Sequence, residues 1–151
     1  MSKVTMKDIK KLRDETQAGI MEVKKALEEA KGDEKKAKEI LKREGLTKAA
    51  KRADKATGEG QIYSYIHNGG RVGAMVEVRC ETDFVAKGDV FQKLCKELAM
   101  QIVSMNPKNV KDLLKQDYIR DSSKKMEDLV KETSAKVKEN IVVSKIVRLN
   151  I

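Results

Sequence analysis

The sequence has few of the side chains from which active sites and covalent cross-links are built. Its 151 residues include one histidine, two cysteines, one proline and no tryptophan. His67 alone cannot supply a Ser-His-Asp relay, a multi-histidine metal site or a paired imidazole acid and base. The interval between Cys80 and Cys95 fits neither a CxxC redox pair nor a zinc site, so both are expected to be reduced, buried thiols. Hydrolase or transferase chemistry is disfavoured, and no metal or cofactor is expected.

Two longer patterns are also missing. The chain contains neither a GxxxxGK[ST] loop nor a GxGxxG turn after a strand, so it shows no phosphate cradle of its own. A nucleotide involved in its function would therefore be bound by a partner. There is no run of eighteen apolar residues and no signal peptide, which predicts a cytoplasmic protein without membrane association.

The chain is rich in charge, at 38% of residues, and carries a formal net charge of +9. A positive excess can indicate a nucleic-acid partner, because Lys and Arg release counterions from phosphates. Acidic residues are interleaved with the basic ones, however, and residues 1–57 contain no aromatic side chain to stack on a base. A solvated surface without specific nucleic-acid binding is favoured, and a basic nucleic-acid-binding module is retained as the alternative.

Three short helices are predicted in residues 1–45, followed by a Lys- and Ala-rich linker at 46–59. Thr5 and Asp8 can cap the first helix, which should end near Thr16. The third helix should follow Asp33 and end at Gly45. Apolar side chains repeat at helical spacing and should face one core: Ile9, Leu12, Ile20, Val23, Leu27, Ala30, Ala37, Ile40 and Leu41.

Residues 60–151 alternate between strand and helix patterns and predict an α+β core. A hairpin is indicated around the turn Asn68-Gly69-Gly70, with a strand that ends at Cys80. A helix should run from Asp89 to Pro107, Asn109 should cap a short successor, and a longer helix is expected at 118–138. The β-branched residues at 141–147 should return as a strand. The fold expected is a small antiparallel sheet covered on one side by helices.

The segment Thr82-Asp83-Phe84-Val85-Ala86-Lys87 lies between the predicted strand and the following helix. Thr82 or Asp83 could simply cap a turn, and Phe84 with Val85 could pack beneath the helix. An aromatic residue beside an acidic one in a connecting loop is also typical of an interface anchor. The residues themselves leave both interpretations open.

Two long motifs resemble signatures of the elongation factor Ts family. The first is residues 81–87, ETDFVAK, preceded by MVEVRC at 75–80, and the second is LRDETQAGIMEVKKAL at 12–27. The segment ENIVV at 139–143 also resembles the short bacterial members. The resemblance covers nearly the whole chain, with Gln17 where the family usually has Gly and Ile20 where it often has Met.

This resemblance implies a function without covalent chemistry, namely guanine-nucleotide exchange on elongation factor Tu during translation elongation. It implies a bundle like ubiquitin-associated domains at 1–45, a linker, and a dimerisation-type core at 60–151. Asp83 and Phe84 would insert beside the Mg²⁺ and phosphate site of the partner, flanked by Thr82 and Val85. A homodimer is left open. The contacts implied for the N-terminal module are Lys10, Arg13, Ile20 and Met21.

Overall fold

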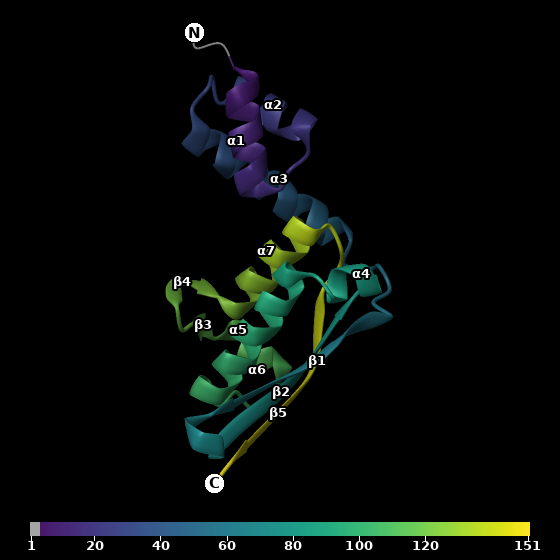
Figure 1. Ribbon diagram of the computed structural model, residues 1–151, viewed down its shortest axis with the longest axis vertical. Coiled ribbons are helices and arrows are strands. Elements are labelled where there is room, and N and C mark those ends of the chain that lie inside the picture. Colours follow the sequence, from purple (N-terminus) through teal and green to yellow (C-terminus); the bar gives the residue numbers. More distant parts are fainter. Residues whose placement is uncertain (1–3) are drawn as a thin grey trace. The chain divides into compact units, whose positions relative to one another are not determined.

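The computed structural model describes residues 4–151, which form two compact units that divide between Lys48 and Ala49 (Figure 1). The first unit contains α1 (Met6–Thr16), α2 (Ile20–Glu29) and most of α3 (Glu34–Lys51). Its core consists of aliphatic side chains at the predicted helical spacing, except that Ile20, which was expected in this core, is 46% exposed. The buried members are Ile9, Leu12, Val23, Ala26, Leu27, Ala30, Ala37 and Leu41.

The ends of α1 follow the predicted capping signals. The Thr5 hydroxyl accepts a hydrogen bond from the Asp8 N–H at 3.2 Å, and the Asp8 carboxylate accepts one from the Thr5 N–H at 2.9 Å. This reciprocal pair satisfies two amide donors that the helix itself cannot pair. At the other end Gln17 adopts a left-handed conformation with φ 58°, and its N–H donates to the Arg13 carbonyl. The short break between the first two helices is confirmed.

The prediction that Gly45 ends the third helix is wrong, because α3 continues to Lys51. A helix-interior glycine costs only about 1 kcal/mol relative to alanine, which good helix formers on both sides can offset. Leu46, Ala49 and Ala50 supply such neighbours, and the Thr47 hydroxyl bonds back to the Arg43 carbonyl at 3.0 Å. The first residues of the expected linker are therefore helical.

The second unit is built on a three-stranded antiparallel sheet with the order β1-β2-β5. Strand β1 (Glu59–His67) and strand β2 (Val72–Cys80) form the predicted hairpin through the 3₁₀ turn η1 (Asn68–Gly70). Strand β5 (Val142–Asn150) pairs with the other edge of β2. The expected α+β class is confirmed.

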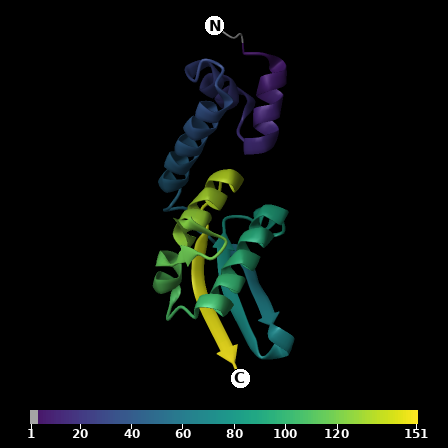
Figure 2. The same ribbon diagram turned by 90° about the vertical axis from the view of Figure 1, so that its left-hand side faces the viewer.

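Helices cover one face of this sheet (Figure 2). They are α4 (Asp83–Ala86), α5 (Asp89–Met105), α6 (Val110–Lys115) and α7 (Met126–Val137). Phe91 of α5 is fully buried in the same continuous core as Val76 and Val78 of β2. Asn109 caps α6 as predicted, accepting from the Asp112 N–H at 2.8 Å.

The long helix expected at 118–138 is wrong in its first part, where a small hairpin replaces it. Strands β3 (Asp117–Tyr118) and β4 (Asp121–Lys125) form this hairpin, and α7 begins only at Met126. The buried Gln101 amide holds its start by donating to the Asp117 carbonyl at 3.0 Å and accepting from the Ile119 N–H at 3.1 Å. Tertiary hydrogen bonds thus override a local helical pattern.

The other face of the three-stranded sheet carries exposed apolar side chains. Ile66 lies in register with Gly73, which in turn lies opposite Leu149, and Met75 lies opposite Val147. Their exposed fractions run from 46% for Val147 to 73% for Leu149. Among the described helices, none combines the length and apolar character needed to cross a membrane.

Candidate functional site

The segment between β2 and α5 folds into the single-turn helix α4, which presents the motif recognised in the sequence. Thr82 is its N-cap, and the Thr82 hydroxyl accepts a hydrogen bond from the Val85 N–H at 3.3 Å. Ala86 is buried and Val85 packs partly against the core, so the inner side of the turn anchors it. The outer side carries Asp83 and Phe84.

Phe84 is 85% exposed, whereas Phe91, the other phenylalanine, is completely buried. The interpretation in which Phe84 packs beneath the following helix is therefore wrong, and the large aromatic side chain of the core is Phe91, from that helix itself. A phenylalanine exposed to this extent leaves a large apolar area in water, which a partner could bury.

Asp83 lies beside Phe84 and is also accessible. Its carboxylate pairs with the Lys87 ammonium one helical turn later, at 3.0 Å, and both side chains are largely exposed. The hydrogen bond from Lys87 is the main cause that lowers the pKa of Asp83 below its usual range. The turn thus presents an ionised carboxylate next to an aromatic ring.

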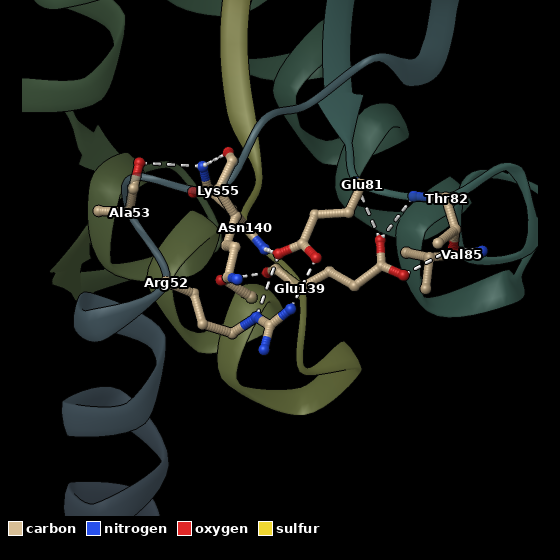
Figure 3. A network of polar contacts seen from close by, with 9 residues as sticks. Arg52, Ala53, Lys55, Glu81, Thr82, Val85, Glu139 and Asn140 are labelled. Atoms are coloured by element: carbon tan, nitrogen blue, oxygen red, sulfur yellow. Dashed lines mark hydrogen bonds and ion pairs between the residues drawn. The ribbon is translucent and has the colours of Figure 1, made fainter.

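The backbone that enters α4 is held by the buried carboxylate of Glu139, which lies between α7 and β5 (Figure 3). Glu139 accepts hydrogen bonds from the Glu81 N–H at 2.9 Å, the Thr82 N–H at 3.0 Å and the Thr82 hydroxyl at 2.6 Å. Glu139 lies just after α7 and is only 9% exposed. Three donors converge on one side chain that is distant in sequence.

A second carboxylate, that of Glu81, joins three segments of the second unit. It accepts from the Arg52 guanidinium at 2.6 and 3.1 Å and from the Asn140 N–H at 2.8 Å. The side-chain amide of Asn140 in turn donates to the carbonyls of Ala53 and Lys55. The Arg52 guanidinium is the main cause that lowers the pKa of Glu81.

Sequence reasoning identified Thr82 and its neighbours but missed Glu139 and Arg52. Glu139 stands 57 residues from Thr82, and no spacing rule pairs positions that far apart. The available signal was indirect, since Glu139 and Asn140 lie within the third segment that resembles the family. Their role becomes visible only once β5 is paired with β2.

The four N-terminal candidates lie in the first unit, separate from the α4 turn. Lys10 and Arg13 are exposed on α1, and Ile20 and Met21 begin α2 with 46% and 73% of their surface exposed. Two apolar and two basic side chains thus remain available on the surface of the bundle.

The two thiols are buried and reduced, as predicted. Burial raises the pKa of Cys95 to about 12, so this thiol is unsuited to act as a nucleophile. His67 is exposed and its Nδ1 lies 2.7 Å from the Tyr65 hydroxyl. Within residues 4–151, no three histidine, cysteine or carboxylate side chains gather as a metal site would require.

Comparison with known proteins gives one consistent family. The family model described as "Elongation factor TS" matches residues 81–151. The chain is similar to elongation factor Ts of Oleidesulfovibrio alaskensis, with 39% identity over 196 positions that include all of this chain and 99% of that protein. It is 40% identical over 190 positions to the protein of Thermoanaerobacter pseudethanolicus, covering 96% and 93% of the two chains.

The protein of Prochlorococcus marinus strain AS9601 is 38% identical over 197 positions, with 100% and 90% coverage. Because the first alignment has 196 positions and this chain has 151 residues, at least 45 positions of that relative have no counterpart here. The match nevertheless extends over both units. The chain therefore belongs to the elongation factor Ts family, whose members are non-enzymatic nucleotide exchange factors of translation elongation.

Proposed function

We propose that this chain promotes GDP release from elongation factor Tu by inserting Asp83 and Phe84 beside the Mg²⁺ and phosphate site of that GTPase. Family membership implies the partner and the exchange reaction. The observation that carries the insertion is the 85% exposure of Phe84 on a turn whose inner side is anchored. Thr82 and Val85 hold that turn, and the reaction would take place in the cytoplasm.

Exchange of this kind requires a surface that binds the nucleotide-free GTPase more tightly than the loaded one. Coupling between two ligands is reciprocal, so a factor that weakens GDP binding is itself bound more weakly when GDP is present. A thousandfold coupling corresponds to about 4 kcal/mol, which one or two aromatic anchors in a pocket can supply. Neither an acid, a base nor a nucleophile is needed.

The two parts of the reaction are assigned to different side chains. Phe84 fills a pocket of the partner, and the Asp83 carboxylate places negative charge where the metal and phosphates are held. Negative charge close to a phosphate disfavours bound nucleotide, because like charges repel strongly in a site with little water. The exposed residues of the first unit dock on the partner's nucleotide domain and contribute affinity. They are Lys10, Arg13, Ile20 and Met21.

The direct test is Phe84→Ala in the full chain. Release of fluorescent GDP from elongation factor Tu is followed with saturating amounts of each variant. Losing an anchor of about 2 kcal/mol or more lowers the stimulated rate at least about thirtyfold. Ile119→Ala, which truncates an apolar side chain with 42% exposure on the β3–β4 hairpin, is the control and keeps the parental rate. A parental rate for Phe84→Ala would refute the insertion.

The exposed face of the three-stranded sheet supports the further proposal that two copies of the chain associate. The apolar residues Ile66, Met75, Val147 and Leu149 are flanked on the same face by Glu77 and Lys145, which lie opposite each other. Opposed copies could bury the apolar residues and pair these opposite charges. Sedimentation equilibrium tests this: Val147→Asp should shift a dimer to a monomer, and a parental chain that is monomeric at all concentrations contradicts the dimer.

The rival function, nucleic-acid binding, predicts something different. A basic module would bind RNA or DNA at physiological salt, with an affinity that falls steeply as salt increases. Binding to elongation factor Tu without measurable binding to RNA at that ionic strength would exclude it.

A further inference from the structure

Two peptide groups beside the candidate site belong to neither neighbouring element. Strand β2 ends at Cys80 and α4 begins at Asp83, so the N–H groups of Glu81 and Thr82 lie outside both the sheet ladder and the helix. Buried backbone donors without partners cost free energy and loosen the chain around them. Here both donate to one carboxylate oxygen of Glu139.

Glu139 is itself held in place by the end of α7. Lys138 adopts a left-handed conformation with φ 60° that ends the helix, and the Ser134 hydroxyl donates to the Glu139 carbonyl at 2.5 Å. The next residue, Asn140, donates its N–H to the Glu81 carboxylate at 2.8 Å. Residues 81–82 and 139–140 therefore bind each other reciprocally, each pair supplying both a carboxylate and N–H donors.

The second oxygen of Glu139 fixes the cap of α4. The Thr82 hydroxyl donates its only hydrogen to Glu139 and accepts from the Val85 N–H, so both of its bonds have a defined direction. A four-residue helix cannot maintain its own conformation, since a single helical turn is unfavourable in isolation. The orientation of α4 must therefore come from such contacts.

Phe84 depends on this support more than a packed side chain would. With 85% of its surface exposed, its ring is placed by the backbone of α4 and not by surrounding side chains. An anchor whose backbone is already held in its bound conformation loses less ordering entropy on binding. Losing the support would leave the ring present but less often correctly placed.

We propose that Glu139 is a positioning residue for nucleotide exchange, which acts through the Thr82 cap to hold Phe84 in the orientation that enters the partner. This inference rests on the proposed function, since it assigns a support to the same anchor. It adds a residue from the far end of the chain to the site.

The test is a double-mutant cycle in the full chain, with Glu139→Gln, Phe84→Ala and the combined variant. The amide keeps the size of the carboxylate but cannot accept all three hydrogen bonds as strongly. Losing a charge-assisted bond should lower stimulated release of fluorescent GDP from elongation factor Tu about tenfold. In the Phe84→Ala background the same change should alter the rate less than about twofold, because the supported side chain is gone.

Glu97→Gln is the matched control, since Glu97 is a second buried carboxylate, 7% exposed, in the same unit. It accepts from the Tyr118 hydroxyl and the Arg120 guanidinium, each at 2.7 Å, and these belong to the β3–β4 hairpin region. Glu97→Gln should lower the melting temperature without lowering the exchange rate. If Glu139→Gln does not fold, Thr82→Val takes its place in the cycle. It removes the hydroxyl that joins Glu139 to the α4 cap, and with it both hydroxyl bonds, and keeps the Glu81 and Thr82 N–H bonds to Glu139.

The outcomes separate the two proposals. Equal losses for Glu139→Gln in both backgrounds, or an equal loss for Glu97→Gln, would show a general effect of stability and overturn the positioning role. If Phe84→Ala is slow and Glu139→Gln keeps the parental rate, only the positioning role of Glu139 is refuted. A parental rate for Phe84→Ala would refute the proposed insertion and the role of Glu139 together.

Discussion

Phe84 and Phe91 lie close together in the sequence but have opposite surroundings, 85% and 0% exposed. Phe91→Ala should lower the free energy of unfolding by about 3–5 kcal/mol, because it leaves a cavity in the main core. Phe84→Ala should change it by less than about 0.5 kcal/mol, as exposed truncations usually do. Urea titration of both variants measures this difference. A large loss for Phe84→Ala would mean that the ring is buried in solution.

The pKa of Glu81 gives a prediction for acid conditions. Its folded pKa is lowered, mainly by Arg52, so Glu81 stabilises the fold at pH values above its unfolded pKa. That contribution is lost as the pH falls from the unfolded pKa through the lower, folded one. Glu81→Gln should therefore be less stable than the parent near neutral pH, and the difference should narrow in acid.

Urea unfolding at several pH values between 7 and 3 provides the measurement. Arg52→Gln should reduce the acid dependence in the same way, because it removes the other partner of the pair. A stability difference that stays constant over the whole range would show that ionised Glu81 does not contribute.

At the level of single residues the sequence predicted local features better than distant ones. Thr5 and Asp8 were identified as a cap because both partners lie within one helical turn. Glu139 was missed because its partners lie 57 and 58 residues away. Whether Phe84 pointed inward or outward could not be decided for the same reason, since distant contacts orient α4.

Strands β1 and β2 contain one glycine each, and the two should respond differently to the same substitution. Gly60 has φ 150°, and an added Cβ would overlap the Val78 carbonyl oxygen and lie 2.7 Å from the Arg79 Cα. At Gly73 the nearest atom, at 2.5 Å, is the flexible Cδ1 end of Ile66. Backbone cannot move away as a side-chain end can, so only Gly60 should resist substitution.

Gly60→Ala should therefore lower the free energy of unfolding by about 2 kcal/mol or more. Gly73→Ala should cost clearly less, and Gly58→Ala, with no atom within 4 Å of the new Cβ, provides the neutral reference. Thermal unfolding of the three variants ranks their losses of stability. Equal costs at Gly60 and Gly73 would contradict the backbone conflict.

Elements whose apolar residues repeat at regular spacing were predicted well. Elements whose conformation depends on tertiary contacts were not. Strand β2 and helix α5 follow the apolar pattern closely, because one side of each faces a core. Strand β1 does not, since Tyr63 and Tyr65 pack against the core while Ile62 and Ile66 are exposed. The β3–β4 hairpin has a helical pattern in its sequence but is held by Gln101, and α3 continues beyond Gly45. In the hairpin the helical spacing was outweighed by hydrogen bonds from Gln101, and in α3 the glycine was outweighed by the helix formers around it.

For the whole molecule, the fold class was predictable because the pattern changes once, from three amphipathic helices to alternating strands and helices. The chain retains both units although at least 45 positions of a relative are absent from it. Each unit has its own buried core, and every residue proposed to contact the partner lies on one of the two. The two units can therefore be assigned separate roles in the reaction.

The proposed roles are docking for the first unit and displacement of the nucleotide for the α4 turn. They predict different results for Arg13→Ala and Phe84→Ala. Arg13 is exposed on α1. In the proposed function it contributes docking energy that is equal in the bound ground state and during release. Its loss should raise the concentration of factor needed for half-maximal GDP release by about three- to tenfold and leave the maximal rate unchanged. Phe84→Ala should instead lower the maximal rate, since the contact proposed for Phe84 strengthens only as GDP leaves. A titration of each variant against elongation factor Tu separates the two effects, and a lower maximal rate for Arg13→Ala would mean that the first unit takes part in displacing the nucleotide.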